Sequence, residues 1–325
     1  MKDPDQSDDR RALELVTEDF DDALSLMRSV GFRLDLIYPA DEPQSAVLSH
    51  EGKMVRLRTP GAPSLSRELP RFEPRFVLTR AGTVPAAGRA GMFYRDLVPG
   101  RLDGRYIASH IKIEQGGPVA DWVHYHRIAL QVIIVRRGWV RVVYEDEGEP
   151  FEMEAGDMVL QPPLIRHRVL ESSPGLEVVE ITAPALHETF ADHEMELPTG
   201  KRERRDFDGQ YFLRHIAAKT PWTSFGDAEA QETTMSDATG GIAEIRTIRP
   251  GRASSISFGP GSGELVFGFV LEGKARLDHS GIFELGPADA FVIPPANPWT
   301  LSDMSADFRL LHMTTARLDA GARCQ

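Results

Sequence analysis

Short stretches of alternating apolar and polar residues dominate the chain between residues 106 and 182. Alternation over a few residues predicts β-strands, because successive side chains of a strand point to opposite faces. Glycine and proline punctuate these stretches, which is typical of an all-β barrel or sandwich. The predicted strands cover residues 106–114, 131–136, 139–145, 150–154, 157–160 and 177–182.

The same pattern returns in the last third of the chain. Residues 240–248 correspond to 104–114, residues 267–277 to 132–142, and residues 288–295 to 156–163. Self-similarity of this kind indicates two similar structural units. The sequence therefore predicts two copies of one barrel.

A different pattern precedes the barrels. A short strand over residues 12–16 is followed by a helical stretch with apolar residues at three-to-four spacing, ended by Gly31, and then by strands over 32–38, 45–49 and 53–58. The order βαβββ and the phrase VGFRLDLIYP resemble one module of the glyoxalase-type vicinal oxygen chelate fold. Such modules carry metal ligands on their first and last strands. The last strand here offers Arg56 and Arg58, so we interpret the module as a metal-free structural or dimer-forming appendage.

The domain boundaries follow from these patterns. Residues 1–60 form the small α+β module, and residues 61–90, rich in Pro, Arg, Ala and Gly, form an irregular linker. Residues 91–200 and 201–325 form the two barrels. The predicted fold class is thus mainly β.

Three histidines at fixed spacing lie in the first barrel. His124 and His126 are two apart on a predicted strand and therefore share a face. His167 follows the pair Pro162-Pro163, which ends a preceding strand. Three imidazoles suit Fe(II), Zn, Mn, Ni or Cu and leave open positions for water, dioxygen or a chelating substrate.

The spacing of His124, His126, Gln131 and Gly138, followed by Gly156, Pro162 and His167, resembles the two motifs of the cupin superfamily, with a double-stranded β-helix (jelly-roll) fold. The family normally has Glu at the position of Gln131. We expect Gln131 to be a weak ligand or a hydrogen-bonding group beside the metal. The texts HYHRIALQ and AGDMVLQPPLIRH resemble bicupin ring-cleaving enzymes such as gentisate and hydroxynaphthoate dioxygenases, which implies one divalent metal ion, with Fe(II) favoured.

The second copy has no residue of this ligand set. Val266 stands at the Gln131 position, Trp299 stands at the His167 position, and the histidine pair falls on the glycine-rich residues 258–263. We expect a degenerate barrel whose interior is filled by Trp299 with Phe267 or Phe269.

Residues around the predicted metal suggest an apolar pocket. The substrate-binding candidates are Arg168, Ile113, Ile134 and Leu160. An arginine beside a ligand histidine on a strand points to the opposite face, so Arg127 and Arg166 are expected on the outside. His187 and His193 lie among acidic residues and are interpreted as solvated linker residues.

Composition limits the partners. The net charge of −12 disfavours nucleic acid, and the basic run over residues 201–205 is interpreted as a solvated linker. No apolar run approaches the ~18 residues of a membrane span, and the N-terminus is polar and acidic, so we expect a cytoplasmic protein without membrane contact. The single cysteine, Cys324, excludes a disulfide within the chain. A small-molecule substrate and a homodimer are the expected partners.

Two functions stay open on the sequence alone. The first is an Fe(II)-dependent dioxygenase of a small aromatic or hydroxy-acid substrate. The second is a Zn- or Mn-dependent isomerase-like protein or a non-catalytic small-molecule-binding protein. Proteins with one fold catalyse many different reactions, so the residues that line the pocket must distinguish the two functions.

Overall fold

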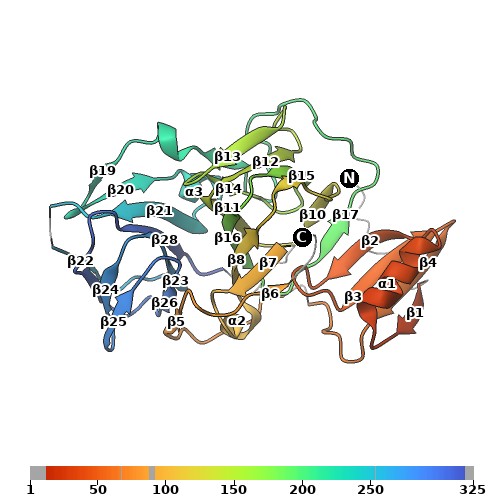
Figure 1. The fold of residues 1–325 in the computed structure, drawn as a ribbon, viewed down its shortest axis with the longest axis horizontal. Helices are drawn as coiled ribbons and strands as arrows, with labels where there is room; N and C mark the ends of the chain where they lie inside the picture. The colour runs from red at the N-terminus through yellow and green to blue at the C-terminus, as the bar shows by residue number, and fades with distance from the viewer. Residues whose placement is uncertain (1–11, 67, 88–91, 253, 319–325) are drawn as a thin grey trace.

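The computed structural model describes residues 12–66, 68–87, 92–252 and 254–318. Two β-barrels lie side by side, and a small α+β module covers the outer end of the first barrel (Figure 1). Cys324 and the first eleven residues of the predicted N-terminal module lie outside the described residues. Within the described part of the chain, no helix is both long and apolar enough to span a membrane.

The N-terminal module has the predicted element order. It consists of β1 (Leu13–Val16), α1 (Phe20–Ser29), β2 (Arg33–Tyr38), β3 (Ser45–His50) and β4 (Lys53–Arg58). The strands pair in the order β1-β4-β3-β2, with β1 parallel to β4. Phe20 of α1 packs with Ala46, Leu48 and Leu57 of the sheet. Its helix neighbours Ala23, Leu24 and Met27 are partly buried on the same side, whereas Leu26 is exposed.

The first barrel consists of two facing sheets. One contains β9 (Gly117–Pro118), β10 (His124–His126), β12 (Trp139–Tyr144), β13 (Phe151–Glu154) and β15 (His167–Ser172). The other contains β6 (Ala86–Ala87), β7 (Met92–Asp96), β8 (Ile107–Ile113), β11 (Leu130–Arg137), β14 (Met158–Leu160), β16 (Leu176–Ala183) and β18 (Leu213–His215). The short helix α2 (Arg101–Gly104) joins β7 to β8.

The second barrel repeats this arrangement. Its larger sheet contains β5 (Val77–Thr79), β19 (Thr223–Phe225), β20 (Ala228–Glu232), β21 (Ala243–Arg249), β23 (Leu265–Glu272), β26 (Ala290–Ile293) and β28 (Arg309–Thr315). Its smaller sheet contains β22 (Ser255–Phe258), β24 (Ala275–Asp278), β25 (Ile282–Leu285) and β27 (Trp299–Ser302). A 3-10 turn (Ala217–Lys219) and the helix α3 (Met235–Ala238) lie in the connections. The mainly-β fold class is confirmed.

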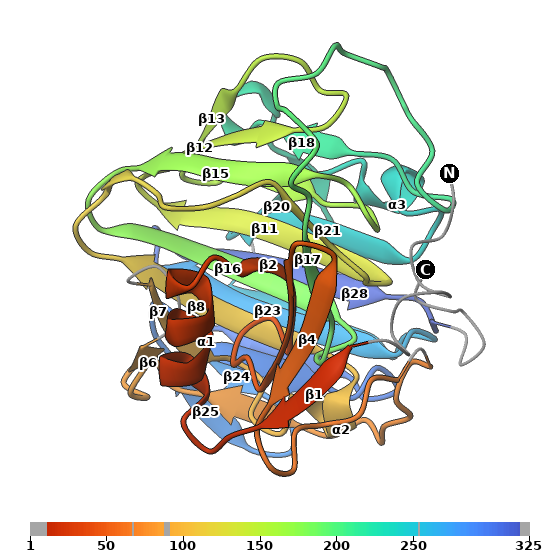
Figure 2. The ribbon, with the colours of Figure 1, turned by 90° about the vertical axis from the view of Figure 1, so that its right-hand side faces the viewer.

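The module and the first barrel share one continuous sheet. The linking strand is β17 (Thr189–Ala191), which pairs with β2 on one edge and with β10 on the other. The sheet therefore runs from β1 through β17 to β13. Figure 2 views the molecule from the module's side, with α1 and the module strands in front of the first barrel.

The two barrels exchange edge strands, which differs from the predicted linker and barrel boundaries. Val77–Thr79, within the segment expected to be irregular, forms β5 and pairs with β26 of the second barrel. Conversely, β18, from the segment assigned to the second barrel, pairs with β14 of the first. Each barrel thus takes an edge strand from the chain that precedes the other barrel. These strands have only three residues, too few for alternation to predict them.

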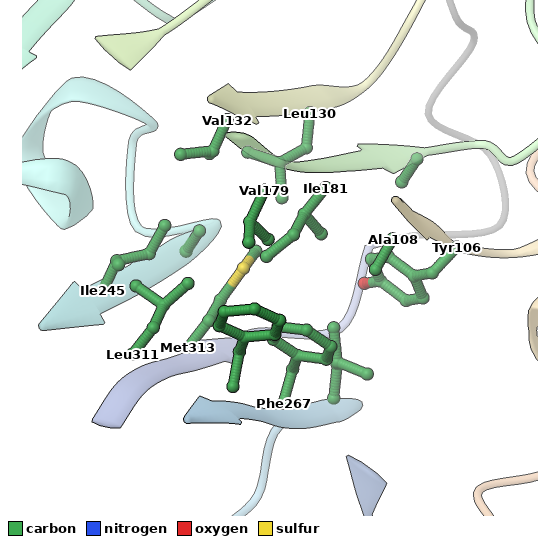
Figure 3. Close-up of a cluster of buried hydrophobic side chains, with 14 of the residues drawn as sticks. Tyr106, Ala108, Leu130, Val132, Val179, Ile181, Ile245, Phe267, Leu311 and Met313 are labelled. Atoms are coloured by element: carbon green, nitrogen blue, oxygen red, sulfur yellow. The ribbon is translucent and has the colours of Figure 1, made fainter. Parts of the chain in front are cut away.

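The largest apolar core lies between the barrels. The outer faces of their two larger sheets pack together, with Val132, Val179 and Ile181 on one side and Ile245, Phe267, Leu311 and Met313 on the other (Figure 3). Phe267 and Phe269 belong to this core. The prediction that one of them fills the second barrel was wrong, because both point to the outer face of β23.

Candidate metal centre

Two neighbouring strands bring the three predicted histidines together. His124 and His126 project from β10 on the same face, and the β10–β15 register places His124 opposite His167. All three side chains are buried, and one ring nitrogen of each lies within 4.8 Å of the others. The ring centroids of His124 and His167 are 4.2 Å apart. A site of this kind needs tertiary pairing, since residues 126 and 167 are far apart in the sequence.

Hydrogen bonds orient the imidazole rings. The Nδ1–H of His124 donates to the carbonyl oxygen of Trp122 at 2.8 Å, and the Nδ1–H of His167 donates to that of Ile165 at 3.0 Å. A carbonyl oxygen only accepts, so Nδ1 carries the proton and Nε2 keeps its lone pair. Nδ1 of His126 lies 3.0 Å from the hydroxyl of Thr189 on β17. Neutral imidazoles held through Nδ1 are what a divalent metal ion requires of its histidine ligands.

Gln131 lies beside the histidines in a chain of amides. Its Nε2 donates to Glu180 at 3.1 Å, and its Oε1 accepts a hydrogen bond from Gln161 at 2.9 Å. The same amide nitrogen of Gln161 lies 3.4 Å from Nε2 of His167. The hydroxyl of Tyr144 donates to Gln161 at 2.6 Å. Burial and the nearby Glu180 raise the pKa of Tyr144, so Tyr144 stays a neutral donor.

Two carboxylates that were not predicted from the sequence adjoin the histidine cluster. Glu180 on β16 accepts from Gln131, and Oδ1 of Asp121 lies 3.5 Å from Nδ1 of His124. The backbone N–H of Val169 holds the other oxygen of Asp121 at 2.9 Å. Glu180 lies opposite Ile133 in the β11–β16 register. Alternation within β16 predicts which residues share a face with Glu180, but it does not predict which strand lies beside it.

The histidines open into a cavity of about 790 Å³ inside the first barrel. Its walls are mostly apolar side chains from β8, β11, β12 and β16. The N-terminal module supplies a further wall, through Phe20, Leu24 and Arg28 of α1 and through Leu34 and Ile37 of β2. The three α1 residues recur every fourth position and so lie on one side of the helix. The module, interpreted from the sequence as an appendage, is therefore part of the site.

Only one of the four predicted substrate residues lines this cavity. Ile113 does, together with Ile111. Ile134 and Leu160 are fully buried in the core between the barrels, because Ile133 and not Ile134 shares the inward face of β11 with Gln131. Arg168 lies between His167 and Val169, which both face the cavity, and so points to the other side of the sheet. These three placements correct the prediction.

The other arginines next to the clustered histidines also point away from the cavity. Arg127 forms an ion pair with Glu188 at 2.8 Å, and Arg166 forms one with Asp192 at 3.0 Å. The guanidinium of Arg166 also lies over the ring of Tyr125, 4.1 Å from its centroid. Their placement agrees with the strand alternation.

The two histidines expected to be solvated have different surroundings. His187 is 5% exposed, and its ring centroid lies 5.4 Å from that of His126, so its interpretation as a solvated residue was wrong. His193 is exposed, as expected, and its Nε2–H donates to the carbonyl oxygen of Leu34 at 2.7 Å. It thus links the first barrel to the module.

The second barrel has aromatic rings where the first has its histidines. Phe258 pairs with Trp299 as His124 pairs with His167, and the two rings stack with centroids 3.8 Å apart. His312, opposite Gly268, occupies the position equivalent to Glu180. Burial lowers the pKa of His312 to about 3, so this histidine is neutral. The predicted position of Trp299 inside this barrel is confirmed.

The barrels and the histidine cluster define a two-barrel jelly roll, with one candidate metal centre among the residues that the structure describes. Solved structures support the fold. A putative glyoxylate-induced protein from Pseudomonas aeruginosa is 14% identical, with a TM-score of 0.56, over 80% of this chain and 95% of that one. A salicylate 1,2-dioxygenase from Pseudaminobacter salicylatoxidans is 16% identical, with a TM-score of 0.54, over 76% and 86%.

A single-substitution variant of oxalate decarboxylase from B. subtilis is 12% identical, with a TM-score of 0.52, over 69% of this chain and 73% of that one. No protein-family model matches the sequence, and no curated protein matches it. Identities this low show a shared fold. The chemistry has to be argued from the site itself.

Proposed function

We propose that this protein is a metal-dependent enzyme, an Fe(II) dioxygenase of a small aromatic or hydroxy-acid substrate. The observation that carries the proposal is the cluster of three buried histidines, with two of the Nδ1 atoms hydrogen-bonded to carbonyl oxygens and the third beside a hydroxyl, at the wall of a large apolar cavity. Histidines that fill a barrel for structural reasons need no common orientation of their Nε2 atoms.

The residues of the chain have distinct parts in this proposal. His124, His126 and His167 would hold the ion, and Gln131 would be a fourth, weaker ligand or a hydrogen-bonding neighbour. A bound Fe(II) supplies Lewis acidity toward substrate oxygens and the electrons that activate dioxygen. Tyr144 and Gln161 position the Gln131 amide, and the apolar walls exclude water from the substrate.

The test is elemental analysis of the purified protein and of its His167→Ala variant, followed by anaerobic loading with Fe(II) and oxygen-uptake assays with hydroxybenzoates and catechols. His279→Ala is the matched control, because His279 is equally buried but lies in the second barrel. We expect near one equivalent of metal in the wild type and in the control, and loss of the metal in His167→Ala.

Iron-dependent oxygen uptake supports the dioxygenase. Absence of bound metal in the wild type and after loading contradicts the metal centre itself. Bound metal without oxygen uptake contradicts the dioxygenase and favours the second candidate.

That second candidate is a Zn- or Mn-dependent isomerase-like enzyme or a small-molecule-binding protein. One observation favours an isomerase: Glu180 places a carboxylate beside the candidate ligand Gln131, and proton-transfer chemistry needs a general base near the metal. Conversion of a hydroxy-carbonyl compound by the Zn- or Mn-loaded protein under anaerobic conditions would distinguish it from the dioxygenase.

A further inference from the structure

The charged side chains around the cavity are mostly acidic. Among the described residues that line it, Arg28 is the one lysine or arginine. It lies in the last turn of α1, on the module side, and is exposed to solvent. Five carboxylates line the same cavity: Asp21, Asp41, Glu42, Asp121 and Glu180.

Two of these carboxylates lie against the ligand set itself. Asp121 is 3.5 Å from the Nδ1 of His124, and Glu180 accepts a hydrogen bond from Gln131 at 3.1 Å. A divalent ion held by neutral imidazoles and an amide carries two positive charges. Asp121 and Glu180 together offset them, so the occupied site would have no net charge with which to attract an anion.

The arginines that could have paired with a negatively charged substrate are not available to it. Arg127 and Arg166 are held in ion pairs with Glu188 and Asp192 outside the barrel, and Arg168 points away from the cavity. Arg28 lines the module side of the cavity, so a substrate carboxylate beside the histidines would lie in an apolar space without a bidentate partner. Burial of such a charge is costly unless it is paired.

The remaining walls fit an apolar ring. Side chains from four strands face the cavity: Ile111, Ile113, Ile133, Val142, Leu176 and Val178. The rings of Trp122 and Tyr144 lie beside the histidines, with the Tyr144 ring stacked on His167 at a centroid distance of 5.5 Å. Such walls stabilise an aromatic or aliphatic body through burial and ring packing.

Resting on the proposed function, we infer that the site selects an uncharged, largely apolar molecule with two neighbouring oxygen atoms and no acidic proton, such as an ortho-alkoxy aryl ketone, over the analogue that carries a carboxylate. This narrows the substrate class of the metal centre: hydroxy acids are disfavoured and neutral chelating aromatics are preferred. The selectivity arises from Asp121 and Glu180 beside the ligands and from the absence of an inward-facing cation among the described barrel residues.

The test compares two probes that share an ortho-methoxy oxygen and a carbonyl oxygen, the neutral 2-methoxyacetophenone and the anionic 2-methoxybenzoate, on the Zn-loaded protein. Zinc allows binding to be measured by calorimetry without turnover. We expect 2-methoxyacetophenone to bind about tenfold more tightly than 2-methoxybenzoate, or more, since an unpaired charge near the site costs at least that much.

Two variants separate charge from shape. Glu180→Gln keeps an oxygen that accepts the hydrogen bond from Gln131 and removes one negative charge. The ratio of the affinities for the neutral and the anionic probe should therefore fall several-fold. Glu152→Gln removes the same charge from an exposed position on β13, and its preference should match that of the wild type.

The outcomes distinguish this inference from the proposed function. If the wild type binds no zinc, the metal centre and this inference both fail. If zinc binds and 2-methoxybenzoate binds as tightly as 2-methoxyacetophenone, the metal centre stands and the inference is wrong. A preference that is unchanged in Glu180→Gln contradicts the role given to this carboxylate.

Discussion

A single hydroxyl links the N-terminal module to a candidate metal ligand. Thr189 lies on β17, between the module strand β2 and the histidine strand β10, and its Oγ1 is 3.0 Å from Nδ1 of His126. Groups that orient a ligand histidine typically contribute about 10-fold to 100-fold to metal affinity.

We therefore expect Thr189→Val, which keeps the shape of the side chain, to weaken zinc binding about 10-fold or more. Zinc affinity can be measured by competition with a chelator of known affinity. Thr189→Ser keeps the hydroxyl and should bind zinc nearly as the wild type does. Equal affinities of the wild type and Thr189→Val would show that the hydroxyl does not orient His126.

His312 should make the stability of the protein depend on pH. Its folded-state pKa is about 3, lowered by burial and then by Arg246, against an ordinary value near 6.5. Between these values the unfolded chain binds a proton that the folded chain does not, so stability falls as the pH is lowered from about 6.5 toward 3.

The His312→Phe variant should lack this contribution. In urea unfolding of the metal-free protein, the loss of stability between about pH 7 and pH 5 should be about 2 kcal/mol smaller than in the wild type. A phenyl ring is suited to the site, since Phe258 and Trp299 already surround it. The same pH dependence in both proteins would indicate that His312 becomes protonated in the folded state.

At the scale of elements, strand β23 shows how the second barrel is filled. Gly268 faces the interior, opposite Phe291, and a Cβ atom added there would lie 2.2 Å from the Phe291 ring. In the first barrel the equivalent residue is Ile133, which lines the cavity. The ring of Phe291 thus occupies space that the first barrel leaves open.

Gly268→Ala should therefore destabilise the protein by about 1–3 kcal/mol, because overpacking forces the ring and backbone to shift. Gly259→Ala is the control: a Cβ there meets nothing within 4 Å, so its effect should stay within about 0.5 kcal/mol. Chemical denaturation of the three proteins measures both effects. A Gly268→Ala variant as stable as the wild type would mean that the second barrel can expand without cost.

At the scale of the whole molecule, the barrels depend on each other. They exchange β5 and β18, and their larger sheets bury each other's outer faces. Separation would expose the whole apolar core between them.

We expect the two barrels to unfold together. Tryptophan fluorescence, which reports Trp122 and Trp139 in the first barrel and Trp222 and Trp299 in the second, should give the same midpoint as circular dichroism in denaturant. A Trp299→Phe variant removes part of the second-barrel signal and should leave the coincidence of the two probes unchanged. Two resolved transitions would contradict the mutual dependence.

The sequence by itself determined the features that depend on local alternation and spacing. The strands, the repeat of the barrel and the shared face of His124 and His126 all follow from the two-residue period of a strand. The same period places Ile133 on the inward face, two residues from Gln131, and Ile134 on the outer face. The same period places Arg168, next to His167, on the outer face.

Only the tertiary structure decided which strands and side chains are neighbours. The approach of Glu180 to Gln131, the exchange of β5 and β18 and the wall that α1 adds to the cavity all depend on pairing between distant segments. Strand alternation gives the face of each side chain, but it does not give the neighbouring strand or its register. That is the physical reason why the sequence predicted the shared face of the histidine pair but not the carboxylates beside the histidine cluster.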